Sequence, residues 1–133
     1  MSSQQLIDLV KQDWSGQPEI AQACENVIKN IISEKNAEVF RHLTFLAIQK
    51  LTDSALTSED IVRLTQYLSG ERVGLFSAGF EYIGLHGQFV LDADNSRYAY
   101  FENKIAHPVT GDVINDVKDN VFMFFALNDG VLK

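Results

Sequence analysis

The sequence predicts an α+β fold, with helices in its first half and an antiparallel sheet in its second. Apolar residues recur at helical spacing before Gly70, whereas short segments rich in aromatic and β-branched residues alternate with turn residues after it. The chain has 133 residues, 46% of them apolar and 22% charged, which is typical of one globular domain. We therefore expect a single domain over residues 1–133, in which a helical layer (about 3–69) packs on a hairpin-linked sheet (about 72–132).

Four helices are expected in the first half, and the first two have clear boundaries. Ser2 or Ser3 can cap the first helix, which ends at Ser15-Gly16. Pro18 suits the first turn of the second helix, where a missing N–H is tolerated. The second helix has the clearest amphipathic pattern of the chain, formed by Ile20, Cys24, Val27, Ile28, Ile31 and Ile32.

The third and fourth helices are predicted from their caps and apolar stripes. Asn36 is a suitable N-cap for a third helix that extends to Leu51 and is apolar on more than one side. Thr57 and Asp60 form an approximate capping box at the start of the fourth helix, and Gly70 ends it.

Five short strands are expected after Gly70, at residues 72–76, 80–85, 88–91, 98–101 and 121–127. They are separated by turn residues at Ser77-Ala78-Gly79, His86-Gly87, Asp94-Asn95-Ser96 and Pro108–Gly111. Residues 112–120 fit either a short helix or the approach to the last strand. Asn128-Asp129-Gly130 predicts a final turn.

Charge and cysteine content exclude several classes of protein. The net charge of -7 argues against nucleic-acid binding, because affinity for phosphates depends on Lys and Arg. The most apolar window, residues 73–91, contains Glu81 and His86 and does not predict a membrane span. A single cysteine, Cys24, and the lack of a signal-peptide pattern at the N-terminus favour a cytoplasmic location.

The sequence predicts no catalytic residue, metal site or cofactor, and we expect a protein that is not an enzyme. Cys24 lies on an apolar stripe, where a thiol is inert. The three histidines have no zinc-ligand spacing. Residues 92–96 begin like a calcium loop, but the glycine and the bidentate glutamate of that loop are missing.

The first functional hypothesis is a small acidic interaction protein that binds or inhibits another macromolecule and is itself a homodimer. Surplus aromatic residues in the predicted strand at 98–101 must point away from the core, toward solvent or a partner. An acidic rim around them would suit a basic protein surface. The predicted partner-binding residues are Tyr98, Tyr100, Asp92, Asp94, Asp112 and Asp116.

The second hypothesis is a small-molecule-binding domain or enzyme with an aromatic pocket between helices and sheet. His86, in the turn Gly84-Leu85-His86-Gly87, would line that pocket together with Glu81 and Tyr82. A third hypothesis, mimicry of nucleic acid, requires the aspartates of the second half to form an array on one face.

Overall fold

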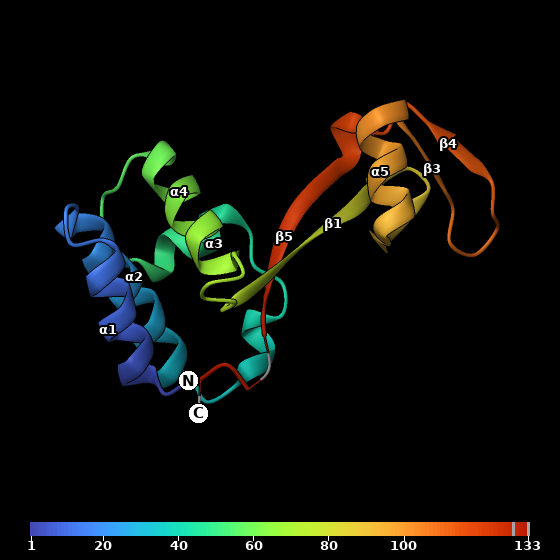
Figure 1. The fold of residues 1–133 in the computed structure, drawn as a ribbon. Coiled ribbons are helices and arrows are strands. Elements are labelled where there is room, and N and C mark those ends of the chain that lie inside the picture. The colour runs from blue at the N-terminus through green and yellow to red at the C-terminus, as the bar shows by residue number, and fades with distance from the viewer. Residues whose placement is uncertain (129, 133) are drawn as a thin grey trace. The chain divides into compact units, whose positions relative to one another are not determined.

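The computed structural model of the chain describes residues 1–128 and 130–132, and its helices and strands confirm the predicted α+β class (Figure 1). The chain forms two compact units. Unit 1 contains Met1–Ser77 and Phe125–Lys133, and unit 2 contains Ala78–Phe124. The expectation of a single domain over residues 1–133 stays a prediction, because two contact units can belong to one folding domain.

Unit 1 is mainly helical, and most of its caps are the predicted ones. Ser2 begins the first helix with a capping box, in which its hydroxyl accepts the N–H of Gln5 at 3.1 Å. Thr57 caps the last helix by accepting the N–H of Asp60 at 3.2 Å. The helices are α1 (Ser3–Asp13), α2 (Pro18–Ser33), the 3-10 helix η1 (Ala37–Phe40), α3 (Phe45–Leu51) and α4 (Ser58–Ser69).

The predicted continuous helix over residues 36–51 is wrong, because the chain breaks between η1 and α3. Asn36 caps η1, as its position predicted, but η1 ends after four residues. Leu43 instead pairs its backbone with Phe125, with N···O distances of 2.7 and 2.8 Å. Thr44 then caps α3 with its hydroxyl. A long-range backbone pairing therefore replaces the expected helical turn.

Apolar side chains from all the α-helices of unit 1 meet in one core, which also takes in the ends of two strands. Phe76 and Phe125 are both buried, and the Phe125 ring packs edge-on against Phe45 at 5.0 Å between centroids. The core consists of Leu6, Ile7, Val10, Ile20, Ala23, Cys24, Val27, Ile28, Ile31, Phe40, Leu43, Ile48, Leu64, Leu68, Val73, Leu75, Phe76 and Phe125.

The main sheet has the strand order β2-β1-β5, and the chain enters unit 2 along β1 (Phe76–Gly84) and leaves it along β5 (Val121–Leu127). The antiparallel hairpin of β1 with β2 (Gly87–Leu91) turns at residues 85–86, close to the predicted turn. The predicted strand at 72–76 and turn at 77–79 are wrong, because β1 begins only at Phe76 and continues through Gly79.

Gly79 fits within β1 because it has no side chain. An aromatic ring occupies the space that a side chain at this position would need. A Cβ added at Gly79 would lie 2.8 Å from the ring of Phe124. The glycine that suggested a turn is therefore a site of close packing within a strand.

The predicted strand at residues 98–101 is also wrong, because these residues lie in helix α5 (Ala93–Glu102). Asp92 is its N-cap, and its carboxylate accepts the N–H of Asn95 at 2.8 Å. Asn103 ends the helix in the left-handed conformation, with φ of 54°. The aspartate and asparagine residues that suggested a turn are thus part of a helix start.

The remainder of unit 2 is a hairpin of β3 (Lys104–Ala106) and β4 (Val113–Asn115), followed by the 3-10 helix η2 (Lys118–Asn120). Residues 112–120 therefore contain a strand and a single short 3-10 turn, and both of the alternatives for this stretch apply in part. Unit 2 has its own small core, made of Tyr82, Leu91, Ala99, Ile105, Ile114 and Val117.

The predicted turn Asn128-Asp129-Gly130 includes Asp129, which lies outside the described residues. Beyond it, Val131 and Leu132 pack against the core of unit 1.

Candidate functional site

Helix α5 directs aromatic side chains toward solvent. All ten residues of this helix are described by the structure, and Ala99 is the buried residue among the ten. Tyr98 is 48% exposed, Tyr100 75% and Phe101 76%. An aromatic side chain that stays exposed contributes little hydrophobic stabilisation to the fold. Clusters of exposed aromatic side chains are typical of binding surfaces.

One face of α5 contains an open hollow between two of these rings. Its lining residues are three or four positions apart, which places them side by side on the helix. The hollow measures about 260 Å³ and is lined by Asp94, Arg97, Tyr98, Phe101 and Glu102, and we call it the α5 hollow.

Of the three charged side chains that line the α5 hollow, two form an ion pair with each other and the third does not. Arg97 donates a hydrogen bond to Asp94 at 2.6 Å, so its positive charge is compensated within the helix. Glu102 makes no hydrogen bond or ion pair with the part of the chain that the structure describes. The α5 hollow therefore has a net negative rim with one carboxylate available to a partner.

A second hollow of about 180 Å³ lies on the other side of α5, entirely within unit 2. Tyr100 borders it, and its ring packs edge-on against Phe101 at 4.8 Å between centroids. Its lining is more apolar and contains the cation Lys118: Phe80, Ser96, Ala99, Tyr100, Lys118 and Val121. The two sides of the helix thus differ in charge.

The structure brings together some of the predicted partner-binding residues. Asp94 and Tyr98 line the α5 hollow, Tyr100 lies on the same helix, and Asp92 caps it. Asp112 and Asp116 lie instead at the two ends of β4, and Asp116 has a left-handed backbone, with φ of 56°.

The sequence interpretation missed Arg97, Phe101 and Glu102 as site residues. It treated residues 98–101 as a strand, in which neighbouring side chains point to opposite faces. The local signal that could have found them is Asp92 before Asn95, a helix N-cap pattern that places positions 94, 97, 98, 101 and 102 together.

The three predicted ligand-binding residues do not converge. Glu81 and Tyr82 are both buried, but adjacent residues of a strand point to opposite faces of the sheet. Tyr82 points into the core of unit 2 and stacks on Phe89, with 5.2 Å between ring centroids. His86 is exposed in the β1–β2 turn, and its ring lies 6.4 Å from that of Tyr82.

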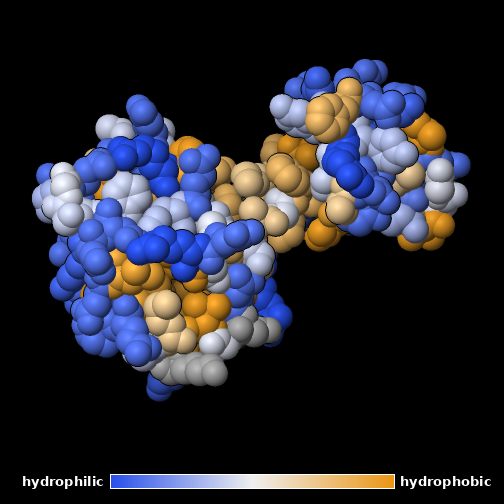
Figure 2. All heavy atoms as spheres, in the orientation of Figure 1, coloured by the Kyte–Doolittle hydropathy of each residue, from blue (hydrophilic) through white to orange (hydrophobic). Residues whose placement is uncertain are grey.

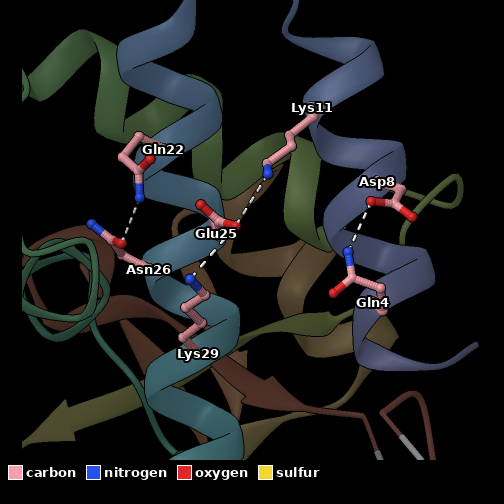
Figure 3. Close-up of polar contacts among 7 residues, drawn as sticks. All are labelled: Gln4, Asp8, Lys11, Gln22, Glu25, Asn26 and Lys29. Carbon is pink, nitrogen blue, oxygen red and sulfur yellow. Dashed lines mark hydrogen bonds and ion pairs between the residues drawn. The ribbon is translucent and has the colours of Figure 1, made fainter.

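Polar clusters in unit 1 connect its helices. Glu25, buried on α2, lies between Lys11 at 3.5 Å and Lys29 at 3.7 Å, and both ammonium groups point toward it (Figure 3). Because Lys11 belongs to α1, this carboxylate links the two helices. Such a contact accounts for a buried carboxylate without a catalytic role.

A second polar cluster is centred on Asp13 at the end of α1. Arg72 donates two hydrogen bonds to its carboxylate at 2.7 and 2.8 Å, and the Tyr67 hydroxyl donates one at 2.6 Å. The bonds from Arg72, and then that from Tyr67, lower the pKa of Asp13.

Cys24 does not have the environment of a nucleophile. It is fully buried in the core of unit 1, and this burial raises the pKa of its thiol to about 12. Among residues 1–128 and 130–132, no three His, Cys, Asp or Glu side chains are placed to hold a metal ion. No helix in that same part of the chain is long and apolar enough to cross a membrane.

Comparison of the chain with protein-family models, with curated proteins and with solved structures finds no match.

Proposed function

We propose that the chain is an interaction protein that binds or inhibits a macromolecule with a basic surface, through helix α5. The exposure of three aromatic side chains on one short helix is the observation that carries this proposal. Tyr98 and Phe101 border the α5 hollow, and Tyr100 borders the hollow on the other side. Aromatic residues at exposed positions provide much of the binding energy in protein interfaces.

The distribution of charge supports a basic partner. Seven of the 18 acidic and three of the 11 basic residues belong to unit 2, which gives it a net charge of -4 in 47 residues. A negative field of this kind speeds encounter with positively charged partners. The same field disfavours nucleic acid as a partner.

The expected homodimer remains part of the proposal. Ile83 on β1 and Val90 on β2 project from the sheet face opposite to Tyr82, and both are exposed. Figure 2 shows further hydrophobic surface along β1 and β5. These two exposed apolar side chains provide a suitable place for a second copy, although Glu81 and Gln88 project from the same face.

No observation favours the ligand-binding or enzymatic alternative, because Glu81 and Tyr82 point to opposite faces of β1. Mimicry of nucleic acid would require the aspartates of the second half to form an array on one face, and no observation on the described residues favours it. The cytoplasmic location remains a prediction from the sequence.

Affinity capture tests the proposed function. The wild-type chain, the double variant Tyr98→Ala, Phe101→Ala and the control Leu85→Ala are each used to capture proteins from a cell extract. Leu85 lies in the β1–β2 turn and is fully exposed, so its loss removes a similar apolar surface away from α5. We expect the wild-type chain and the control to retain the same partner and the double variant to lose it. Equal retention by all three would reject α5 as the binding surface.

A further inference from the structure

The α5 hollow combines aromatic walls with carboxylates at both ends. Tyr98 and Phe101 are three residues apart on α5, so their rings border the same part of the helix face. Asp94 lies one turn before Tyr98, and Glu102 lies one turn after it. A flat cation in the α5 hollow would lie beside both rings and near a carboxylate.

We propose that the α5 hollow binds an arginine side chain in a basic segment of the partner, an inference that rests on the proposed function of α5. A guanidinium group stacks on aromatic rings and donates paired hydrogen bonds to a carboxylate. A lysine ammonium is more strongly hydrated and offers no planar surface, so it gains less from the same walls.

The ion pair already present identifies which carboxylate is available. Arg97 is the cation that lines the α5 hollow, and Asp94 holds its guanidinium at 2.6 Å. This contact shows that a carboxylate on this face accepts a guanidinium. Glu102, which has no such partner among the described residues, is therefore the acceptor for an incoming arginine.

Size and charge favour a single basic side chain as the occupant of the α5 hollow. Its volume of about 260 Å³ lies below the range of roughly 300–1,000 Å³ typical of sites for drug-sized ligands, and suits a single side chain. A second copy of this face would bring Asp94 and Glu102 against their own equivalents, which is repulsive. Charge complementarity therefore favours a partner of opposite charge.

The test measures binding of a short peptide to the full chain by NMR titration at about 0.15 M ionic strength. The probe is a capped peptide of alternating glycine and arginine with three arginines. Two matched peptides contain lysine or uncharged citrulline instead of arginine. We expect the arginine peptide to bind most tightly, to shift the amide signals of residues 93–103, and to bind roughly tenfold more tightly than the citrulline peptide.

Three variants locate the bound arginine. Phe101→Leu removes an aromatic wall but keeps an apolar side chain, and Glu102→Gln removes the charge with little change in shape. Phe122→Leu is the matched control, because Phe122 is an exposed aromatic residue of β5 that does not line the α5 hollow. We expect the first two variants to weaken binding of the arginine peptide about three- to tenfold, and Phe122→Leu to leave it unchanged. All three substituted side chains are exposed, so we expect each variant to keep the wild-type fold. The amide signals of α5 report whether the helix is retained.

Specific results would overturn the inference. Equal affinity for the arginine, lysine and citrulline peptides would do so, as would wild-type binding by Phe101→Leu and Glu102→Gln. If the arginine peptide fails to bind while the captured partner still requires Tyr98 and Phe101, the arginine inference fails and the proposed function stands. If the peptide binds as expected but capture does not depend on α5, the proposed function fails and the α5 hollow remains an arginine site.

Discussion

Asp13 joins the end of α1 to Tyr67 on α4 and to Arg72 beyond it, and its ionisation should affect stability. Its pKa is lowered in the folded chain, chiefly by the hydrogen bonds from Arg72. A group with a lowered folded pKa stabilises the fold above its unfolded pKa, near 3.9, and this contribution is lost as pH falls through the folded pKa. The Arg72 side chain is 61% exposed, and solvent weakens its interaction with Asp13, so the effect should be modest.

We therefore expect Asp13→Asn to lower the urea midpoint of unfolding at neutral pH, and to have progressively less effect as the pH falls below the unfolded pKa, near 3.9, and through the lower folded pKa. Glu71→Gln is the control, since Glu71 makes no ion pair with the described residues. A midpoint difference between Asp13→Asn and wild type that stays constant from neutral to acidic pH would contradict this assignment.

Cys24 provides a second test at the scale of one residue. Burial raises the pKa of its thiol to about 12, so the thiol is both neutral and inaccessible at physiological pH. We expect a thiol reagent such as Ellman's reagent to modify Cys24 only after the chain is unfolded in concentrated guanidinium. Rapid modification of the native protein at about pH 8 would show that the packing of α2 against its neighbours is wrong.

At the scale of secondary structure, helix α5 depends on its N-cap. Asp92 accepts the N–H of Asn95, so Asp92→Ala should destabilise α5 by about 1 kcal/mol, while Asp92→Asn should preserve most of the cap. Amide hydrogen exchange of residues 95–102 measures this difference. Equal protection of these amides in the wild type and in Asp92→Ala would contradict the role of Asp92.

Two of the elements that sequence reasoning misassigned failed for different physical reasons. The helix predicted over residues 36–51 is interrupted because Leu43 pairs with Phe125, and a contact between positions so far apart leaves no local signal. The strand predicted at 98–101 was favoured by its aromatic residues, but strand propensity depends strongly on context. The cap at Asp92 was present in the sequence and should have outweighed it.

Elements with strong local signals were predicted correctly. Pro18 begins α2 and the hairpin of β1 and β2 turns next to Gly87, close to their expected positions. Of the candidate site, Asp94 was predicted on a turn, and Tyr98 and Tyr100 were predicted on a strand. Phe101 and Glu102 were missed, because their place beside Tyr98 is apparent only once the segment is a helix.

At the scale of the whole molecule, the expected homodimer can be tested through the exposed sheet face of unit 2. We expect light scattering to give twice the chain mass of 14.9 kDa, and Val90→Asp to give the mass of one chain. Leu85→Asp, at the exposed turn, should leave the dimer intact. A wild-type chain that is monomeric at all concentrations would contradict the dimer.

The structure shows where in the chain part of the net charge of -7 lies. Unit 2 carries -4 of it and also carries the exposed aromatic side chains of α5. Composition alone could predict an acidic surface. It could not predict which aromatic side chains share that surface, because that depends on the helical geometry of residues 93–102.

Site-specific cross-linking shows whether α5 is the surface that meets a basic partner. A photoreactive benzoyl-phenylalanine replaces Phe101 on α5 or, as a control, Leu46 on α3, which is also exposed. We expect the probe at position 101 to cross-link a partner through a segment rich in arginine, and the probe at position 46 to give no such cross-link. Cross-linking of the partner from position 46, with none from position 101, would contradict this expectation.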